Sequence, residues 1–411
     1  MTGQTIDPTA RLAHIARFEP EIRAFTACDP ARIEADLRTA PPGPLSGRLV
    51  GVKDIIDTAH YPTGYGSDIY AGHRATGDAA CVALLRAAGA TMAGKTVTTE
   101  FAFFRPGPTT NPFDPARTPG GSSSGSAAAV AMGMVDIGIA SQTAASLTRP
   151  ASYCGVVGFK PTYGRYALSG VKALGPSFDA LGTITPDVAT AIAADAVLAG
   201  PVPAASTIVP RAPARIGICR TPWWHEAEDG TRMAMAEAER IFSAHTTVEM
   251  VEMDEFAAAA DLHITIMSFE AAQALAWEYQ ARRETCSPQI VGLIEAGRAI
   301  TRATYEHAQN EAARLRTRAA ALFTRYDMLV APAAPGEAPL RTQGTGSPIF
   351  SRLWTLLYLP TVTLPGLVGP LNMPVGIQCL GPHGADETLF EHALWAEALL
   401  PTRPLSSLLK S

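Results

Sequence analysis

The sequence contains little charge and no strongly basic segment. Only 17% of its 411 residues are charged and 47% are hydrophobic, whereas about 25% charged residues is usual in globular proteins. The formal net charge of −5 is spread along the chain. We therefore expect a large buried core, no nucleic-acid partner and no attachment to a membrane surface.

Long hydrophobic segments and paired cysteines are also lacking. The first twenty residues contain no hydrophobic stretch typical of a secretory signal. The most apolar run, residues 126–147, includes Asp136 and Gln142, and it predicts a buried helix followed by a buried strand, not a membrane span. The six cysteines form no CxxC pair, so we expect reduced, mostly buried thiols and a cytoplasmic location.

Helix and strand patterns alternate along the chain. Residues 78–90 have the periodicity of an amphipathic helix, and longer helical patterns cover 226–244, 268–325 and 386–400. Strands are expected in the apolar segments 48–54, 90–96, 135–143, 154–165, 326–335 and 358–366. This alternation predicts the α/β class, and because no long polar linker interrupts it, we expect one domain over residues 1–411.

Histidine is absent around a segment that is rich in serine. Residues 118–131, TPGGSSSGSAAAVA, contain four serines, but the nearest histidines are His73 and His225. A reactive serine here would need another base. Lys53, at the end of a strand-like segment, is a candidate because burial favours a neutral amine. The alternative is an ordinary lysine paired with Asp54.

Three short motifs match known signatures without the context that these signatures need. Residues 89–96, GATMAGKT, match the phosphate-binding P-loop, but a helical pattern precedes them, so they predict a helix-to-strand turn. GSSSG at 121–125 matches a nucleophile elbow but has no strand before it. HEAED at 225–229 lacks the spacing of a zinc site and predicts a solvated helix start, so no metal is expected.

Longer stretches, in order, identify a resemblance. GVKD at 51–54, TPGGSSSGSAAAVA at 118–131 and ASQTAASLTRPASYCGVVGFKPTYGR at 140–165 resemble the amidase signature family, most closely its malonamidase-like branch. The resemblance covers most of the chain. It implies one large mixed β-sheet flanked by α-helices on both sides, no cofactor, and a homodimer.

The resemblance also implies a catalytic relay. Ser146 corresponds to the nucleophile, and Ser122 to a bridging serine that follows a cis peptide bond. Lys53 corresponds to the base, so the proton of Ser146 would pass through Ser122 to Lys53, with Ser123 supporting the network. The expected chemistry is hydrolysis of an amide C–N bond through an acyl-enzyme on Ser146.

The implied oxyanion hole consists of the backbone N–H groups of Thr143, Ala144, Ala145 and Ser146. These donors would stabilise the negative charge that develops on the carbonyl oxygen of the substrate.

Three residues near the nucleophile depart from the family pattern. Ala145 replaces a glycine, which would introduce strain if that position had a positive φ. Ser141 replaces a threonine and keeps the hydroxyl group. Gln142 replaces an aspartate and removes a negative charge that would stabilise a protonated lysine.

Substrate binding is less defined by the sequence. Arg149 corresponds to an arginine that pairs with a substrate carboxylate in the malonamidase-like branch. The alternative is a structural salt bridge next to Pro150. We expect residues 268–298, with Trp277 and Tyr279, and a loop at 350–354 to line the pocket.

The predicted activity is hydrolysis of small amides, some bearing a carboxylate. Hydrolysis of carbamates or aryl amides is an alternative. So is a role within an amidotransferase, in which the chain supplies ammonia to a partner. A relative that has lost its activity is a further alternative, suggested by Ala145.

Overall fold

The computed structural model describes residues 8–200, 208–404 and 406–410. Its strands are β1 Phe25–Ala27, β2 Leu49–Lys53, β3 Thr91–Thr96, β4 Ile137–Gln142, β5 Val157–Lys160, β6 Ala180–Thr185, β7 Arg215–Cys219, β8 Thr247–Val251, β9 Met328–Pro332, β10 Thr361–Val368 and β11 Pro374–Leu380. Its α-helices are α1 Pro8–Ile22, α2 Pro30–Thr39, α3 Ala80–Ala87, α4 Ser124–Ala131, α5 Thr148–Tyr153, α6 Val188–Leu198, α7 Asp229–Ser243, α8 Ala259–Ala274, α9 Ala276–Arg282, α10 Pro288–Ala299, α11 Arg302–Leu322, α12 Ile349–Leu356, α13 Asp386–Leu399 and α14 Ser407–Lys410.

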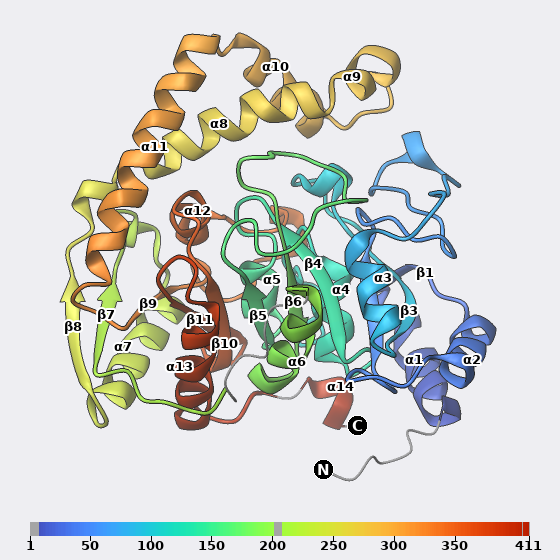
Figure 1. Ribbon diagram of the computed structural model, residues 1–411, viewed down its shortest axis with the longest axis horizontal. Helices are drawn as coiled ribbons and strands as arrows, with labels where there is room; N and C mark the ends of the chain where they lie inside the picture. The colour runs from blue at the N-terminus through green and yellow to red at the C-terminus, as the bar shows by residue number, and fades with distance from the viewer. Residues whose placement is uncertain (1–7, 201–207, 405, 411) are drawn as a thin grey trace.

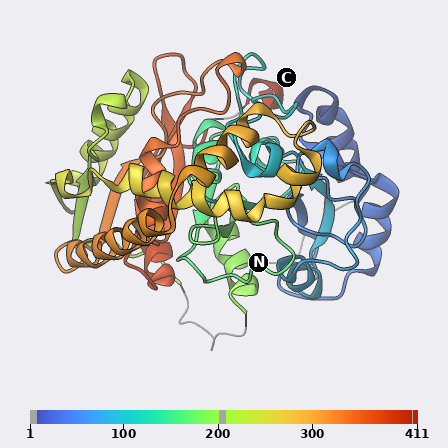
Figure 2. The same cartoon turned by 90° about the horizontal axis from the view of Figure 1, so that it is seen from above.

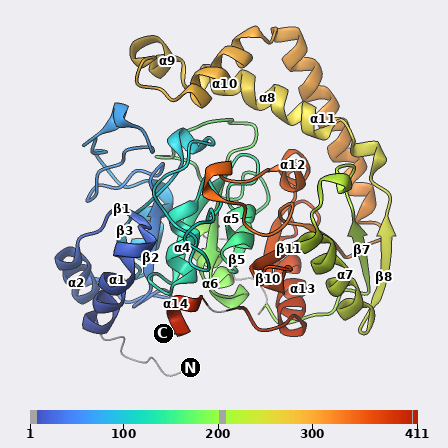
Figure 3. The same cartoon turned by 180° about the vertical axis from the view of Figure 1, so that it is seen from behind.

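One mixed sheet runs through the molecule, with helices on both faces (Figures 1 and 3). In the described part of the chain it has eleven strands, in the order β1-β3-β2-β4-β6-β5-β10-β11-β9-β7-β8. β2 pairs in parallel with β3 and β4, β7 pairs in parallel with β8 and β9, and the strands from β4 to β9 pair antiparallel. The predicted α/β class and the mixed sheet flanked by helices are confirmed.

Several predicted elements lie where the patterns place them. The helix at 78–90 is α3, and Gly89 follows it with a φ of +91°, a conformation that glycine adopts without strain. The segment 90–96 is β3, so the P-loop match is a helix-to-strand turn, as predicted. The long helical pattern at 268–325 divides into the end of α8 and the helices α9, α10 and α11.

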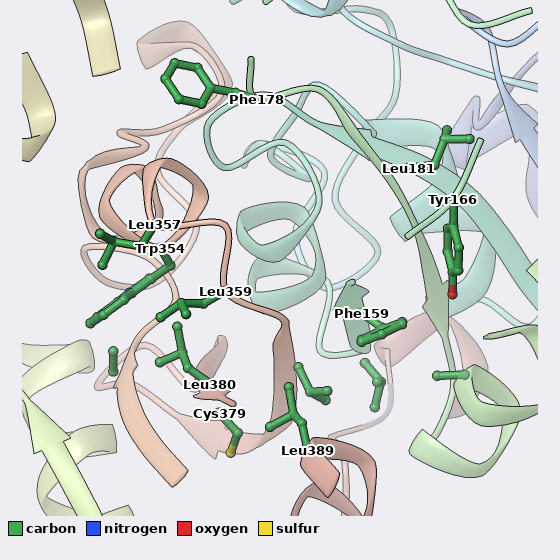
Figure 4. Close-up of a cluster of buried hydrophobic side chains, with 14 of the residues drawn as sticks. Phe159, Tyr166, Phe178, Leu181, Trp354, Leu357, Leu359, Cys379, Leu380 and Leu389 are labelled. Carbon is green, nitrogen blue, oxygen red and sulfur yellow. The ribbon is translucent and has the colours of Figure 1, made fainter. Parts of the chain in front are cut away.

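Alternating side chains of β5 face the two layers of helices. Phe159 packs against Phe390 of α13, with ring centroids 4.3 Å apart, in the apolar cluster of Figure 4. Gly158 faces α5 on the other side, where an added Cβ would approach the Cβ of Ala151 to 2.7 Å. This glycine therefore lets α5, and the loop that precedes it, lie close against the sheet.

Helices α8 to α11 form a helical arm, residues 259–322, that lies across the body of the molecule (Figures 1 and 2). α8 packs against α12. The last helix of the arm, α11, is followed in the chain by β9, and its first helix, α8, contacts α12, which lies beside the candidate site.

Two further observations concern the cysteines and the membrane. All six cysteines are free, and five of them are buried, which confirms the expectation of unpaired thiols. Among the helices that the structure describes, none has the length and apolar character that crossing a membrane requires.

Candidate active site

Lys53 is the last residue of β2, and its side chain meets the serine-rich segment. Because β2 and β4 are parallel, with Val52 opposite Ile139, Lys53 and Ser141 emerge at the same edge of the sheet. The Nζ atom of Lys53 donates to Ser122 Oγ at 2.6 Å and to Ser141 Oγ at 2.8 Å. The lysine is fully buried.

Burial lowers the pKa of Lys53 well below its ordinary value, because the charged amine loses its hydration. The carboxylate of Asp179 acts in the opposite direction and raises this pKa. A neutral Nζ beside Ser122 Oγ is able to accept a proton.

Asp54 pairs with Lys95 and not with Lys53. Lys95 Nζ lies 3.2 Å from Asp54 Oδ1 and also donates to Ile56 O and Thr63 Oγ1. The alternative of an ordinary Lys53–Asp54 pair is therefore wrong. Lys95, the lysine of the P-loop match, is likewise buried within the fold.

Ser122 lies in a loop that contacts the loop of Ser146. The peptide bond between Gly121 and Ser122 is cis, at the position for which the family resemblance implies one. Ser123 donates from its backbone N–H to Ser146 O at 3.2 Å and from its hydroxyl to Ser141 O at 3.3 Å. Ser123 thereby links the two loops.

The backbone carbonyls of the loop from Thr143 to Ser146 are all held by other groups. They accept, in chain order, from His263 Nε2 at 2.8 Å, Thr355 Oγ1 at 2.9 Å, Arg149 N at 3.1 Å and Ser123 N at 3.2 Å. The four N–H groups of the same residues donate to no group in the described part of the chain. Because all four residues line one cavity, their N–H groups are candidate donors to a group bound there.

Gln142 holds the start of α5 in place. Its Oε1 accepts from the backbone N–H groups of Leu147 and Thr148, at 3.0 and 3.1 Å, and from the Thr148 hydroxyl. Its Nε2 donates to Thr355 Oγ1 at 3.0 Å. The side chain of Gln142 therefore spans the loop that carries Ser146.

Ala145 is buried and does not have a positive φ. The strain considered for alanine at this position is therefore absent from this structure. Backbone geometry at Ala145 gives no support to the alternative of a relative that has lost its activity.

The cavity beside Ser146 contains both Ser122 and the four loop residues. Its remaining walls are Ala102, Phe103, Phe104, Arg149, Leu174, Met267, Thr345, Pro348 and Arg352. The Ser146 and Ser122 hydroxyls share this cavity, but no hydrogen bond joins them among the described residues. Of the two contacts that the implied relay needs, the structure therefore contains the hydrogen bond between Lys53 and Ser122 but none between Ser146 and Ser122.

The predicted pocket walls need correction. Trp277 and Tyr279 lie on α9, outside this cavity, and Trp277 is 54% exposed. Among the described residues, the arm contributes Met267, on α8, to the wall. Residues 350–354 belong to α12 and are not a loop, and of these only Arg352 reaches the cavity.

Arg149 is buried, and its terminal nitrogens already donate hydrogen bonds to groups of the protein itself. Its Nη2 donates to Gly121 O at 2.6 Å and to Thr345 Oγ1 at 3.3 Å, and its Nη1 donates to Gly346 O. No carboxylate pairs with it among the described residues, so the alternative of a structural salt bridge is wrong. Its contact with a substrate stays a prediction.

Sequence reasoning missed three supporting residues: Asp179, His263 and Thr355. They lie 33 or more residues from Ser146 along the chain, in segments whose pattern indicates only helix or loop. Burial lowers the pKa of His263 to about 3, so its ring is neutral and Nε2–H donates to Thr143 O. No local signal in the sequence marks these residues.

No metal cluster is formed by the residues that the structure describes. His225 and Glu226 of the HEAED motif lie in a short 3₁₀ helix, Trp224–Glu226, with exposed side chains.

The chain is similar to known proteins along nearly its whole length. The Amidase family pattern matches residues 10–390. A glutamyl-tRNA(Gln) amidotransferase subunit of Thermus thermophilus is 33% identical, over 94% of this chain and 91% of its own length. Among solved structures, the crystal structure of an amidase has a TM-score of 0.86 at 29% identity and covers 95% of each chain. The native peptide amidase of Stenotrophomonas maltophilia has a TM-score of 0.81 at 27% identity, over 97% of this chain and 94% of its own.

The site and these similarities agree over the same segments. Lys53, the serine-rich loop and the loop of Ser146 all lie inside the matched range, residues 10–390. On this evidence, the chain belongs to the amidase family.

Proposed function

We propose that the protein hydrolyses the C–N bond of small amides through an acyl-enzyme on Ser146. The observation that carries this proposal is the hydrogen bond from the buried Lys53 amine to Ser122 Oγ, because Ser122 lines the same cavity as Ser146 and the other loop residues, 143–145. A buried base, a hydroxyl and a row of donors are the three components that acyl transfer requires.

In the proposed first half-reaction, Ser146 Oγ attacks the amide carbonyl carbon. Its proton moves to Ser122 Oγ as the Ser122 proton moves to Lys53 Nζ. The loop N–H groups of residues 143–146 donate to the oxyanion. The C–N bond then breaks, and the leaving nitrogen receives a proton from Ser122, which regains one from Lys53.

In the second half-reaction, water attacks the acyl group on Ser146. Its proton passes through Ser122 to Lys53 and then returns to Ser146 Oγ when the acid leaves. Each group ends in its starting protonation state.

The test combines labelling with turnover. A serine-directed phosphonate should label Ser146, and Ser146→Ala should lose both the label and ammonia release from a panel of small amides, aryl amides and carbamates. Ser124→Ala is a matched control, because Ser124 is buried nearby but donates to Val97 O at 3.2 Å. Turnover that survives in Ser146→Ala would contradict the proposed nucleophile.

A second candidate function is supply of ammonia to a partner enzyme. It is favoured by the 33% identity to the amidotransferase subunit of Thermus thermophilus. In that case the protein should co-purify with other proteins of such a complex from its host and release ammonia from glutamine. Isolation alone with full activity on simple amides favours the hydrolase.

A further inference from the structure

We propose that Arg352 binds an anionic group of the substrate, so that the proposed hydrolase acts on amides that carry a carboxylate. This inference rests on the proposed function and names the substrate class of the same site. It assigns recognition to a residue on α12, not to Arg149.

The charges that line the cavity are of one sign. Arg149 and Arg352 are both in its wall, and no aspartate or glutamate is among its described lining residues. Lys53 is neutral when it acts as a base, and Asp179 is engaged by the Thr143 hydroxyl and by the N–H groups of Leu174 and Gly175. A substrate anion would therefore enter a positive and partly dehydrated cavity.

The two arginines differ in their partners. The terminal nitrogens of Arg149 already donate to two backbone carbonyls and a hydroxyl. The Nε atoms of both arginines are buried without a partner, but the terminal nitrogens of Arg352, unlike those of Arg149, donate to no group in the described part of the chain. A guanidinium is best satisfied by a carboxylate, which accepts two parallel hydrogen bonds.

The position of Arg352 on α12 directs it toward the reacting centre. Thr355, which holds Ala144 O, follows Arg352 by three residues, and residues three apart share one face of a helix. Burial is the main cause of the lowered pKa of Arg149 and of His263, and the charge of Arg352 lowers both further.

Asp261 is the one acid whose charge acts on Arg352 among the described residues. Burial lowers the pKa of Arg352, and Asp261 acts in the opposite direction without forming an ion pair with it; Asp261 is exposed on α8. Water screens such an exposed charge, so it leaves the guanidinium available to a ligand.

The experiment compares matched acid and neutral amides. The pairs are malonamate with malonamide, succinamate with succinamide, and 3-carbamoylbenzoate with isophthalamide. The wild-type protein should prefer the acid in at least one pair. Arg352→Met keeps the aliphatic stem and should reduce the ratio of kcat/KM for the acid to kcat/KM for the neutral amide at least about tenfold. Arg352→Glu should shift the preference toward the cationic glycinamide.

The matched control is Arg318→Met. Arg318 is exposed on α11, and its Nε lies 3.7 Å from Glu255 Oε2. Arg318 is not among the residues that line the cavity. It should leave the preference for acid amides unchanged.

A second measurement does not depend on finding the natural substrate. Malonate should slow phosphonate labelling of Ser146 in the wild-type protein and in Arg318→Met, but not in Arg352→Met. Equal protection of wild type and Arg352→Met would overturn the assignment, and so would a wild-type preference for the neutral member of every pair.

Failure of this inference and failure of the proposed function give different results. Turnover of neutral amides with no dependence on Arg352 rejects the role of Arg352 and retains the hydrolase. An unlabelled Ser146 together with no ammonia release from any amide rejects both.

Discussion

Lys53 shows how one buried side chain sets the chemistry of the site. Its amine is surrounded by hydroxyl groups and a carbonyl, with no carboxylate within ion-pair distance among the described residues. Desolvation therefore controls its pKa, and the neutral form is favoured. The same residue type at position 95 has Asp54 beside it and serves the structure of the fold.

Lys53→Met should remove the base and keep most of the buried volume. We expect ammonia release to fall by about 10²–10⁴-fold, the usual contribution of a general base. In the wild-type protein, kcat/KM should fall as the pH drops below the pKa of Lys53, because a protonated Nζ accepts no further proton. Steady-state kinetics across pH measure both effects.

The fold must be shown to survive in Lys53→Met, by a circular dichroism spectrum equal to that of the wild type. Near-normal rates at neutral pH in this folded variant would contradict the relay.

At the residue scale, the sequence identified those candidate site residues that lie within short, continuous motifs. The segments around Lys53, Ser122 and Ser146 were identified from short stretches, and the structure brings Lys53 to Ser122 within hydrogen-bond distance. The residues that hold the carbonyls, such as His263 and Thr355, are distant in sequence and belong to ordinary helices. Their contacts depend on how the arm and α12 pack, which no local pattern contains.

The loop between β4 and α5 is the element on which the site depends. It is held at its base by Gln142 and along its carbonyls by groups from α8, α12 and the serine-rich loop. Because each carbonyl belongs to the same planar peptide as the N–H of the following residue, fixing the carbonyls restrains these N–H groups, and in the proposed reaction this would preorganise donors for an oxyanion.

Thr355→Val should loosen this loop. The change removes the hydroxyl that donates to Ala144 O and accepts from Gln142 Nε2, and it keeps the shape of the side chain. We expect kcat to fall by about tenfold or more with little change in KM, and stability to fall by about 1–3 kcal/mol, because buried polar groups lose their partner. Kinetics and urea unfolding measure the two effects.

Thr363→Val is the matched control for this change. Thr363 is fully buried in β10, and its hydroxyl has no hydrogen-bond partner among the described groups. Its replacement should leave kcat unchanged, and an equal loss of kcat in both variants would contradict the specific role of Thr355.

The elements that sequence patterns missed share a physical cause. β6 and β11 are buried at every position and therefore lack the alternation of a half-buried strand, and β7 and β8 have only five residues each. The pocket wall was assigned to residues 268–298 because aromatic side chains occur there, whereas packing of the arm brings Met267 to the cavity.

At the scale of the whole molecule, the sheet carries a buried lysine that is not among the residues lining the cavity of the candidate site. Lys160 lies in the central strand β5, and its Nζ donates to Pro161 O at 2.8 Å. Burial lowers the pKa of Lys160 to about 8 from an ordinary value of 10.5, against the attraction of Asp386.

Stability should therefore depend on pH through Lys160. Between pH 8 and 10.5 the unfolded chain keeps its proton while the folded chain loses it, so the free energy of unfolding should rise with pH across this window. The shift corresponds to about 3 kcal/mol. Lys160→Met should lack this contribution, and urea unfolding at pH 8, 9 and 10 measures the difference.

Burial also lowers the pKa values of Lys53 and Lys95, but both lysines are present in the wild type and in Lys160→Met. The difference between the free energies of unfolding of these two proteins, followed across pH, therefore reports on Lys160 alone. Parallel pH dependences of wild type and variant would contradict the prediction.

Periodicity and short motifs were sufficient for the α/β class, the family resemblance and the local segments that contain Lys53, Ser122 and Ser146. The folded chain alone shows that Asp54 pairs with Lys95, that Arg149 is held by backbone carbonyls, and that Arg352 reaches the cavity without a partner. Hydrogen-bond partners and cavity walls come from distant segments; Thr355 and Ala144, for example, are 211 residues apart in the sequence. The packing of the arm and α12 against the sheet brings such segments together, and no local pattern encodes that packing.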